Sequence, residues 1–268
     1  ATAMATTDHS ATWLHLGGNR LRDVSPLVGM RSLRWLAVGD NPLTDLEPVG
    51  QLVKLQNLSI DRLRVDSLLF LSASASLKTL GAAGCGLLSI EGLEGCPQLE
   101  ELHVQGNHIS DLRPLGELVH LRRLNLDGNR VADLAPLAGI GSLVSLNLNW
   151  SRLGDLAPLS LLRSLEELEL GWTGTQDVLP LGTLRSLRWL RLTANPLTHI
   201  SPLADLPKLE NLALDGATVT DIHDLAADDA APSLKSLALQ GTRVDTAEGT
   251  QGAADVAALR ARGVNVSL

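Results

Sequence analysis

Residues 121–142 read LRRLNLDGNRVADLAPLAGIGS, and almost all of the chain is a variation on this 22-residue stretch. At Leu143 the same series of apolar residues begins again. Self-similarity at a fixed period of this size indicates stacked supersecondary units, none of which can bury its leucines alone. The last two starts, Leu234 and Ala261, follow longer steps, after ten starts spaced by 22 residues at Ala11, Leu33, Leu55, Leu77, Leu99, Leu121, Leu143, Leu165, Leu187 and Leu209.

The first half of each repeat predicts a short strand followed by a buried polar ladder. In L-x-x-L-x-L, apolar and polar residues alternate, which is typical of a strand with one buried face. At the ninth place the chain turns inward, and a side-chain amide there can bond backbone groups that the turn leaves unpaired. Leu63 and Ala217 cannot make this bond, so we expect the ladder to be weakest near them. The polar residues at the ninth place are Asn19, Asn41, Asn107, Asn129 and Asn195, with Cys85, Ser151, Thr173 and Thr242 as smaller substitutes.

The second half, D-(L/V/I)-x-P-L, predicts a compact turn or a single helical turn. Its aspartate is placed to cap that turn, and its proline suits a first turn, where no backbone N–H is needed. Two repeats have Ser67 and Ser89 instead of the aspartate, and Phe70 and Gly92 instead of the proline; we expect Phe70 to fill core space. The aspartates are Asp23, Asp45, Asp111, Asp133, Asp155, Asp177 and Asp221.

Together, L-x-x-L-x-L-x-x-N and D-x-x-P-L at a 22-residue period resemble the internalin-like class of leucine-rich repeats over residues 11–268. The resemblance implies an α/β-type solenoid, a curved horseshoe of about 11 repeats plus a terminal strand. A parallel sheet would form its concave face, and short turns or 3-10 helices its convex face. The repeats are also similar to the C-terminal sensor domains of bacterial NACHT or STAND-type signalling ATPases. The family implies a surface presented to a partner and leaves the partner open.

Three segments are expected along the chain. Residues 1–10 read as a linker or cloning remnant, residues 11–246 as the solenoid, and residues 247–268 as a C-terminal cap. In the cap, a helix over residues 247–262 would stop at Gly263, before a last strand over 264–268. The core side of the first repeat (Leu14, Leu21, Val24 and Leu27) would face water without a preceding cap, so we expect the natural protein to continue upstream.

Composition disfavours several classes of protein. The formal net charge of -8 argues against a general binder of nucleic acid or acidic membranes, and no run of 18 apolar residues predicts membrane insertion. The two cysteines, Cys85 and Cys96, fall in one repeat and are expected to be reduced core thiols. Few cysteines and no targeting signal favour a cytoplasmic, bacterial setting, with a cell-surface or secreted location as the alternative.

The tryptophans occupy special columns of the repeat. The third, fifth and seventh residues are expected on the concave face, and the eighth and tenth on its rim. Trp13, Trp35 and Trp189 fall at the third place, and Trp150 and Trp172 at the eighth. Strands about 4.8 Å apart would put Trp150 beside Trp172 and Trp13 beside Trp35. Exposed tryptophan is enriched at binding hot spots.

We therefore predict a partner-binding site around Trp150 and Trp172, with a secondary patch of Trp13, His15 and Trp35. The alternative is that each tryptophan lies flat on its neighbour and merely covers the sheet. The predicted site consists of His103, Gln105, Arg123, Asn125, Asp127, Asn147, Asn149, Trp150, Glu167, Glu169, Trp172, Trp189 and Arg191.

The leading hypothesis is a non-enzymatic module, without a cofactor, that binds a protein or peptide on the concave face. Its own missing N-terminal domain is one candidate partner. An alternative is a surface that stacks glycan or cell-wall rings on Trp150 and Trp172, with Glu167 and Glu169 as hydrogen-bond acceptors. A third is an internalin-like adhesin, which would need a signal peptide in the full-length gene.

Catalysis is not supported, because no zinc spacing, nucleophile motif or matched carboxylate pair is present. Asp221, His223, Asp224, Asp228 and Asp229 are better explained as a solvated acidic turn than as a metal site. A tenth-place basic column is expected to pair with nearby aspartates rather than to follow a phosphate backbone. It holds Arg20, Arg64, His108, Arg130, Arg152 and Arg243.

Overall fold

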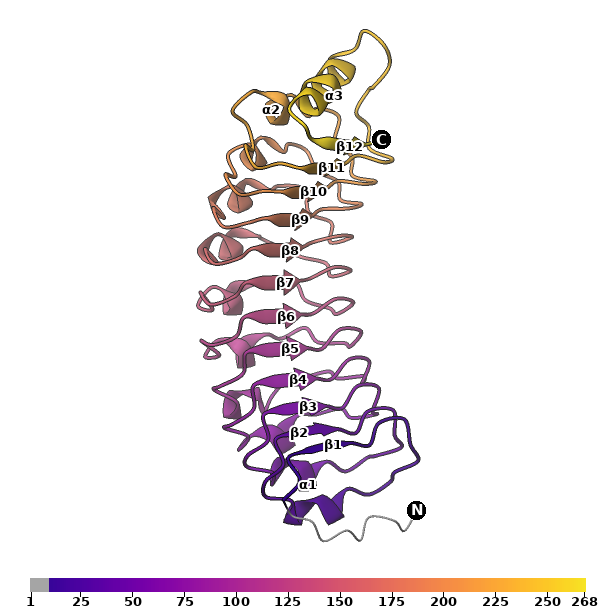
Figure 1. Cartoon of the computed structure of the whole chain (residues 1–268), viewed down its shortest axis with the longest axis vertical. Helices are drawn as coiled ribbons and strands as arrows, with labels where there is room; N and C mark the ends of the chain where they lie inside the picture. The colour runs from indigo at the N-terminus through magenta and orange to yellow at the C-terminus, as the bar shows by residue number, and fades with distance from the viewer. Residues whose placement is uncertain (1–9) are drawn as a thin grey trace. The chain divides into compact units, whose positions relative to one another are not determined.

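The computed structural model describes residues 10–268, so the linker expected at 1–10 lies outside the described residues apart from Ser10. The chain divides into two compact units, Ala1–Val131 and Ala132–Leu268. Both are built from short strands that alternate with single helical turns (Figure 1).

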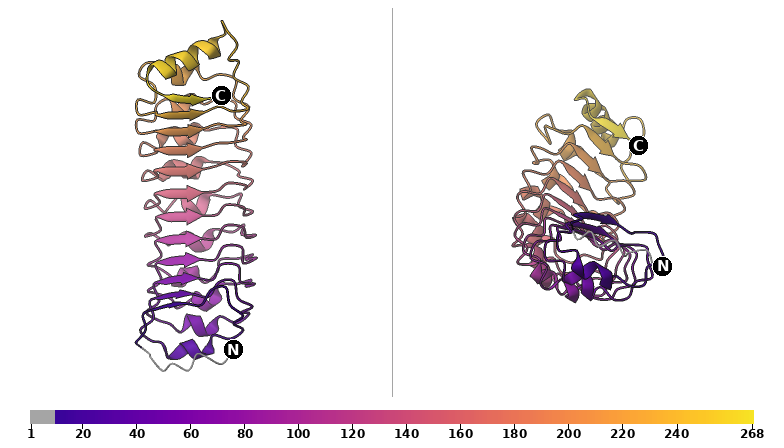
Figure 2. Two further views of the ribbon diagram at one scale, coloured as in Figure 1. Left: turned by 45° about the vertical axis from the view of Figure 1, so that its right-hand side comes forward. Right: turned by 60° about the horizontal axis from the view of Figure 1, so that its bottom comes forward.

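In the first unit, six three-residue strands lie side by side in chain order, and every pair is parallel. They are β1 (Trp13–His15), β2 (Trp35–Ala37), β3 (Asn57–Ser59), β4 (Thr79–Gly81), β5 (Glu101–His103) and β6 (Arg123–Asn125). The helical turns lie across each coil from its strand (Figure 2). They are η1 (Ser25–Gly29), α1 (Glu47–Gly50), η2 (Leu69–Leu71), η3 (Leu93–Gly95) and η4 (Arg113–Leu115).

The second unit repeats this plan with six further parallel strands. They are β7 (Ser145–Asn147), β8 (Glu167–Glu169), β9 (Trp189–Arg191), β10 (Asn211–Ala213), β11 (Ser236–Ala238) and β12 (Asn265–Ser267). The solenoid with a parallel sheet and short 3-10 turns is confirmed. The helical segments are η5 (Ala135–Leu137), η6 (Ala157–Leu161), η7 (Leu179–Thr183), η8 (Ser201–Leu203), α2 (His223–Ala226) and α3 (Gln251–Ala261).

The strand register builds the core. Leu36 pairs with Leu58, and Leu58 pairs with Leu80, so equivalent leucines stack 22 residues apart and are all buried. In the second unit, Leu168 pairs with Leu190 and Leu190 pairs with Leu212, and all three are buried. A three-residue strand is too short to be stable alone, so burial between neighbouring repeats is what stabilises each one.

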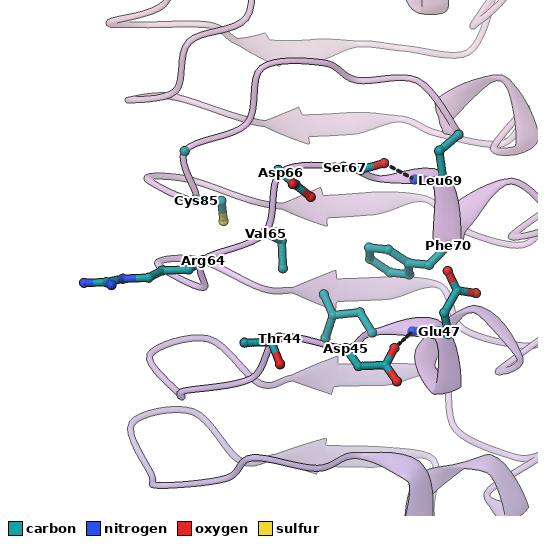
Figure 3. Close-up of a pocket in the computed structure, with 12 residues that line it drawn as sticks. Thr44, Asp45, Glu47, Arg64, Val65, Asp66, Ser67, Leu69, Phe70 and Cys85 are labelled. Carbon is teal, nitrogen blue, oxygen red and sulfur yellow. Dashed lines mark hydrogen bonds between the residues drawn. The ribbon is translucent and has the colours of Figure 1, made fainter.

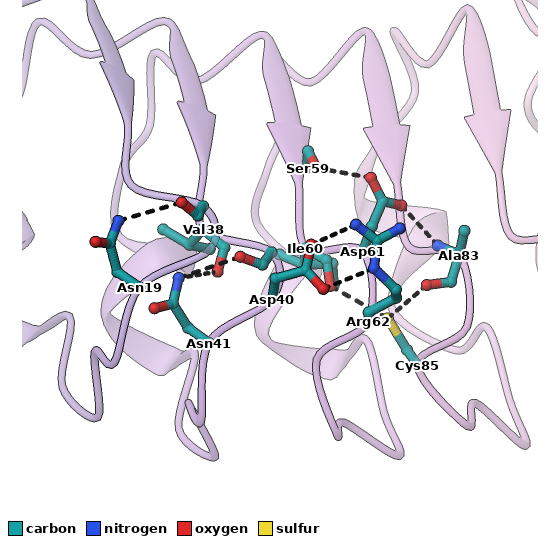
Figure 4. Close-up of polar contacts among 12 residues, drawn as sticks. Asn19, Val38, Asp40, Asn41, Ser59, Ile60, Asp61, Arg62, Ala83 and Cys85 are labelled. Atoms are coloured by element: carbon teal, nitrogen blue, oxygen red, sulfur yellow. Dashed lines mark hydrogen bonds and ion pairs between the residues drawn. The ribbon is translucent and has the colours of Figure 1, made fainter.

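The ninth-place ladder is confirmed at the asparagines. The Oδ1 atom of Asn107 accepts from three successive backbone N–H groups of the preceding repeat at 2.9–3.0 Å, those of Cys85, Gly86 and Leu87. Its Nδ2 donates to two backbone carbonyls at 2.8 and 2.9 Å. Asn41 Nδ2 donates to the equivalent carbonyls of Leu16 and Val38 at 2.8 Å, its Oδ1 accepts the N–H of Leu21 at 3.0 Å, and Figure 4 shows it beside Asn19.

Smaller residues at the ninth place behave differently from one another. Thr173 and Thr242 donate their hydroxyls to backbone carbonyls at 2.8 Å, as expected. The prediction for Ser151 is wrong, because its Oγ is buried without a hydrogen-bond partner among residues 10–268. Where Leu63 interrupts the ladder, the seventh-place Asp61 makes a different bond, accepting the N–H of Ala83 in the following repeat at 2.8 Å (Figure 4).

The repeat aspartates share one backbone hydrogen bond, but they are not the N-cap residues of the helical turns. Each accepts the backbone N–H two residues later at 2.8–2.9 Å, which closes an Asx turn. The cap residue itself is the apolar residue in between, such as Leu134 after Asp133. Ser67 and Ser89 make the same contact at 3.1 Å, so the two irregular repeats keep the turn.

Phe70 is buried in the core, as predicted, and its neighbours make room for its repeat. A Cβ atom on Gly50 would lie 2.1 Å from the Phe70 carbonyl oxygen. Gly92, with a φ of 102°, passes so close to Leu68 that a Cβ would lie 2.4 Å from its carbonyl oxygen. The missing proline is thus replaced by a closer approach of the backbones.

The first repeat differs in part from expectation. Val24 and Leu27 are buried against the next repeat, which corrects the expectation that they face water; Leu14 and Leu21 are half-buried.

Cys85 and Cys96 are free, buried thiols, as predicted, and burial raises their pKa to about 11 and about 12.

Near the C-terminus, α3 and β12 lie where a helix and a strand were expected. The guanidinium of Arg262 donates to three carbonyl oxygens around the end of α2, those of Leu225, Ala227 and Ala230. These bonds fasten α3 to α2. Among residues 10–268, no helix is both long enough and apolar enough to cross a membrane.

Candidate functional site

The eighth place of every repeat has the same unusual backbone conformation. In all eleven repeats its φ lies between 55° and 70°, in the left-handed region. This region costs most residues roughly 1–2 kcal/mol and glycine almost nothing. Glycine occupies six of these places, and Asp40, Arg62, Trp150, Trp172 and Ala194 occupy the rest. Sequence reasoning missed this conformation, although the recurring glycines were a readable signal.

Trp150 and Trp172 stand at this place in neighbouring repeats. Their rings stack with centroids 4.8 Å apart and planes 5° apart, which confirms the predicted adjacency. The side chains nevertheless remain 58% and 54% exposed. Their backbone N–H groups are fixed by bonds of 2.9 Å to Gly171 and Thr193 of the following repeats. Two large indoles therefore sit in water on a rigid backbone that glycine would suit better.

Next to the tryptophans, a polar network spans β7 to β9. The Asn149 side chain donates to Glu169 Oε2 at 2.7 Å and accepts the Gly171 N–H at 2.6 Å. Arg191 Nη1 lies 3.6 Å from the same Glu169 oxygen. Asn149 is only 8% exposed, so it orients Glu169 instead of presenting its own amide to solvent.

The remaining predicted residues of the second unit lie on the same three strands. Trp189 and Glu167 are register partners on β9 and β8, and both are exposed. Asn147 is half-buried, and its Oδ1 accepts the N–H of Asn149 at 3.0 Å. The second unit thus brings together eight of the predicted residues: Asn147, Asn149, Trp150, Glu167, Glu169, Trp172, Trp189 and Arg191.

The other five predicted residues, His103, Gln105, Arg123, Asn125 and Asp127, belong to the first unit. Arg123 pairs with Glu101 at 2.6 Å, and His103 Nε2 lies 3.7 Å from the same carboxylate. The side chain of Asn125 accepts the N–H of Asp127 at 3.0 Å. Gln105 is half-buried, and its Oε1 has no hydrogen-bond partner among residues 10–268.

The predicted secondary patch is a three-ring cluster. Trp13 and Trp35 stack at 4.7 Å with planes 12° apart, and His15 lies 6.1 and 6.0 Å from them. Trp13 and His15 are exposed, and Trp35 is half-buried. Trp35 is covered more than either ring of the Trp150–Trp172 pair, whereas Trp13, at 59% exposed, is as open as Trp150.

In the first unit, the eighth place holds a charged pair instead of an aromatic one. Arg62 Nε donates to Asp40 Oδ1 at 2.6 Å, and the two groups also meet through Arg62 Nη2 and Asp40 Oδ2 (Figure 4). This hydrogen bonding lowers the pKa of Asp40 and raises that of Arg62. Both side chains are exposed, so the pair adds little stability.

A recess of about 560 Å³ opens between the repeats around Phe70 (Figure 3). Asp45 and Ser67 on its wall are bonded to the N–H groups of Glu47 and Leu69. These two polar groups are therefore occupied by the helical turns.

The tenth-place arginines are not paired, which corrects the expected pairing with aspartates. None of them forms an ion pair among residues 10–268. The repeat aspartates direct a carboxylate oxygen at the backbone N–H of the helical turn, and Arg64 extends away from its coil (Figure 3). In the same described residues, no three His, Cys, Asp or Glu side chains converge as metal ligands would.

The sequence of residues 97–139 matches the family model of leucine-rich repeats in two copies. The repeats of this chain are leucine-rich repeats. The structure of the chain is similar to that of an internalin of Listeria monocytogenes, InlF, at 26% identity, over 96% of this chain and 80% of that one, with a TM-score of 0.79.

Other solved structures extend the likeness of this leucine-rich-repeat protein. Internalin C2 of Listeria monocytogenes is 29% identical over 74% of this chain and 81% of its own, with a TM-score of 0.63. A leucine-rich-repeat protein of Leptospira interrogans shares the fold at 20% identity, over 96% of this chain and 72% of that one, with a TM-score of 0.77. The sequence has no match among curated proteins.

Proposed function

We propose that this leucine-rich-repeat protein is a non-enzymatic recognition module that binds a protein or peptide through Trp150 and Trp172. Its fold is consistent with a protein-interaction module. The observation that carries the proposal is the pair of exposed indoles at a left-handed place that holds glycine in six other repeats. The fold does not need tryptophan there, so the residues must serve a different purpose.

The energetics support binding through these rings. Burying about 100 Å² of each half-exposed indole would contribute on the order of 5 kcal/mol before the costs of association. The backbone of both residues is already fixed by hydrogen bonds to the next repeat, so little ordering entropy is lost. Asn149 and Arg191 likewise hold the Glu169 carboxylate in place through a hydrogen bond and an ion pair.

The net charge of the second unit restricts the class of partner that can bind. Residues 132–268 hold 16 Asp and Glu against 10 Lys and Arg, so this unit carries a net -6 of the chain's -8. Such a field repels phosphate backbones and anionic membranes. As the sensor part of a larger cytoplasmic protein, the module would meet its partner inside the cell. An adhesin is the alternative, which the full-length gene decides by the presence of a signal peptide.

The test is affinity capture from a lysate of the native host with three forms of the protein. The first is wild type, the second carries Trp150→Gly and Trp172→Gly, and the control carries Asp40→Gly and Arg62→Gly at the same backbone place. We expect a protein that wild type and control retain and that the tryptophan variant loses, while all three forms unfold cooperatively in urea at similar concentrations. Equal retention by all three would overturn the proposal, and retention of glycans alone would favour the sugar-stacking alternative.

A further inference from the structure

The eighth-place column of the second unit changes abruptly after Trp172. In chain order it reads Trp150, Trp172, Ala194, Gly216 and Gly241, all with a left-handed φ. Trp150 covers one face of the Trp172 indole at 4.8 Å, which is the distance between neighbouring strands. The other face of Trp172 is therefore directed along the stack towards Ala194, whose side chain is a single methyl group.

The two eighth-place residues after Trp172 carry no large side chain. The next place, Gly216, has no side chain, and a Cβ built on it would lie 3.7 Å from the Ala194 Cα. A planar group over Ala194 would continue the Trp150–Trp172 stack at the same spacing. We call this space, between the free face of Trp172 and the Ala194 methyl, the shelf.

The repeat next to Ala194 supplies a carboxylate. Asp215 lies two residues after β10, and its backbone oxygen accepts the Ala194 N–H at 2.8 Å. Its Oδ1 accepts the Gln240 N–H at 3.0 Å, and the side chain is half-buried. Asp215 forms no ion pair among the described residues, whereas Glu169 is engaged by Arg191 and Asn149.

We propose, building on the proposed function, that the shelf takes the guanidinium of an arginine in a basic segment of the partner protein. A guanidinium is planar and stacks on an indole face, and its N–H groups match a carboxylate in geometry and charge. The net charge of -6 in this unit attracts such a segment. A lysine ammonium has no flat face, and a sugar gains nothing from the charge.

The experiment measures fluorescence anisotropy with three labelled eight-residue probes. They are (Gly-Arg)4, (Gly-Lys)4 and (Gly-citrulline)4, in which citrulline keeps the shape of arginine without its charge. We expect saturable binding of the arginine probe by the wild-type chain, at least tenfold weaker binding of the citrulline probe and several-fold weaker binding of the lysine probe. No saturable binding of the arginine probe, or equal binding of the citrulline probe, overturns the inference.

Two variants separate the shelf from general charge attraction. Ala194→Trp fills the shelf with a third ring at a backbone place that already holds two tryptophans, and we expect it to weaken arginine-probe binding at least tenfold. Gly241→Trp puts the same residue in the same conformation two repeats away and should bind like wild type. Asp215→Asn should weaken binding several-fold. Unchanged binding by Ala194→Trp overturns the shelf.

The proposed function can stand when the shelf fails. Suppose that a captured partner depends on Trp150 and Trp172 yet binds Ala194→Trp normally. The proposed recognition function would then hold, and the proposal that the shelf binds a guanidinium would fail. Loss of the captured partner with both the double tryptophan variant and Ala194→Trp supports both proposals together.

Discussion

The eighth place shows two solutions on one backbone. In the first unit, Asp40 and Arg62 have φ values of 55° and 58°; in the second, Trp150 and Trp172 have 60° and 59°. The charged pair satisfies itself, since each group is the other's hydrogen-bond partner. The aromatic pair leaves more than half of each side chain in water. Because the backbone is the same in both cases, the repeat fixes the conformation and leaves the side chain open to selection for another purpose.

The ninth place, by contrast, belongs to the scaffold, and we expect the largest effect there. Asn107→Ala leaves three backbone N–H groups of the preceding repeat without their acceptor, which should lower the free energy of unfolding by about 3 kcal/mol. Urea titration followed by circular dichroism measures this. A loss below about 1 kcal/mol would mean that water replaces the amide and that the ladder is not a main source of stability.

For the eighth place we expect a much smaller change. Replacing Trp150 and Trp172 by glycine relieves left-handed strain but loses ring stacking and adds freedom to the unfolded chain, so the terms offset. The free energy of unfolding should stay within about 1 kcal/mol of wild type. The matched variant with glycine at Asp40 and Arg62 should do the same. A loss of more than about 3 kcal/mol in the tryptophan variant alone would make those rings structural and remove the contrast.

These contrasts mark what the sequence could predict. The 22-residue period predicted the strands, the turns, the asparagine ladder and the stacking of Trp150 on Trp172, because equivalent residues of a stacked repeat must be neighbours. The sequence could not predict which of several possible hydrogen-bond partners a polar side chain takes. Asn149 was expected to face a partner but binds Glu169, and the tenth-place arginines were expected to find aspartates that instead bind backbone.

Ser151 and the shelf illustrate the same limit. A serine at the ninth place has the right chemistry, but only coordinates show that its hydroxyl reaches no acceptor in the described chain. Ala194 and Asp215 were missed because neither residue type is unusual; their meaning comes from the free face of Trp172 next to them. Reading the glycines of the eighth place as a left-handed column would have singled out the tryptophans more firmly.

Moving the aromatic pair to the first unit tests whether the left-handed eighth place is sufficient for two tryptophans to stack. We expect Asp40→Trp with Arg62→Trp to fold, with unfolding free energy within about 1 kcal/mol of wild type, because the conformation accepts tryptophan elsewhere. Stacked indoles should give an exciton couplet in the far-ultraviolet circular dichroism beyond that of wild type. The variant should not gain affinity for the arginine probe, since Ala194 and Asp215 have no equivalents there: the next places hold Gly84 and Gln105. Equal gain would show that any indole pair suffices.

The smallest effect concerns a second polar pair, His223 and Asp255, which docks α3 on α2. His223 Nδ1 lies 2.9 Å from Asp255 Oδ1, which also accepts from Gln251, and Asp255 is only 3% exposed. The hydrogen bond to Asp255, then its charge, raise the pKa of His223, with Asp221 and Asp224 adding to the effect. A raised pKa means that this contribution to stability is complete below the ordinary histidine pKa of about 6.5 and is lost as pH rises through the folded value.

Asp40 has the opposite dependence, because its pKa is lowered: its contribution is present above the unfolded carboxyl pKa and is lost as pH falls. Hydrogen exchange separates the two. Between pH 6 and pH 8.5, after correction for intrinsic exchange rates, protection of the α3 amides should fall in wild type and stay level in His223→Gln, while amides near Asp40 should not change in either. A fall of equal size in His223→Gln would show that another group holds the helix. Protection that rises with pH would reverse the assigned sign, because neutral histidine would then be the form that α3 prefers.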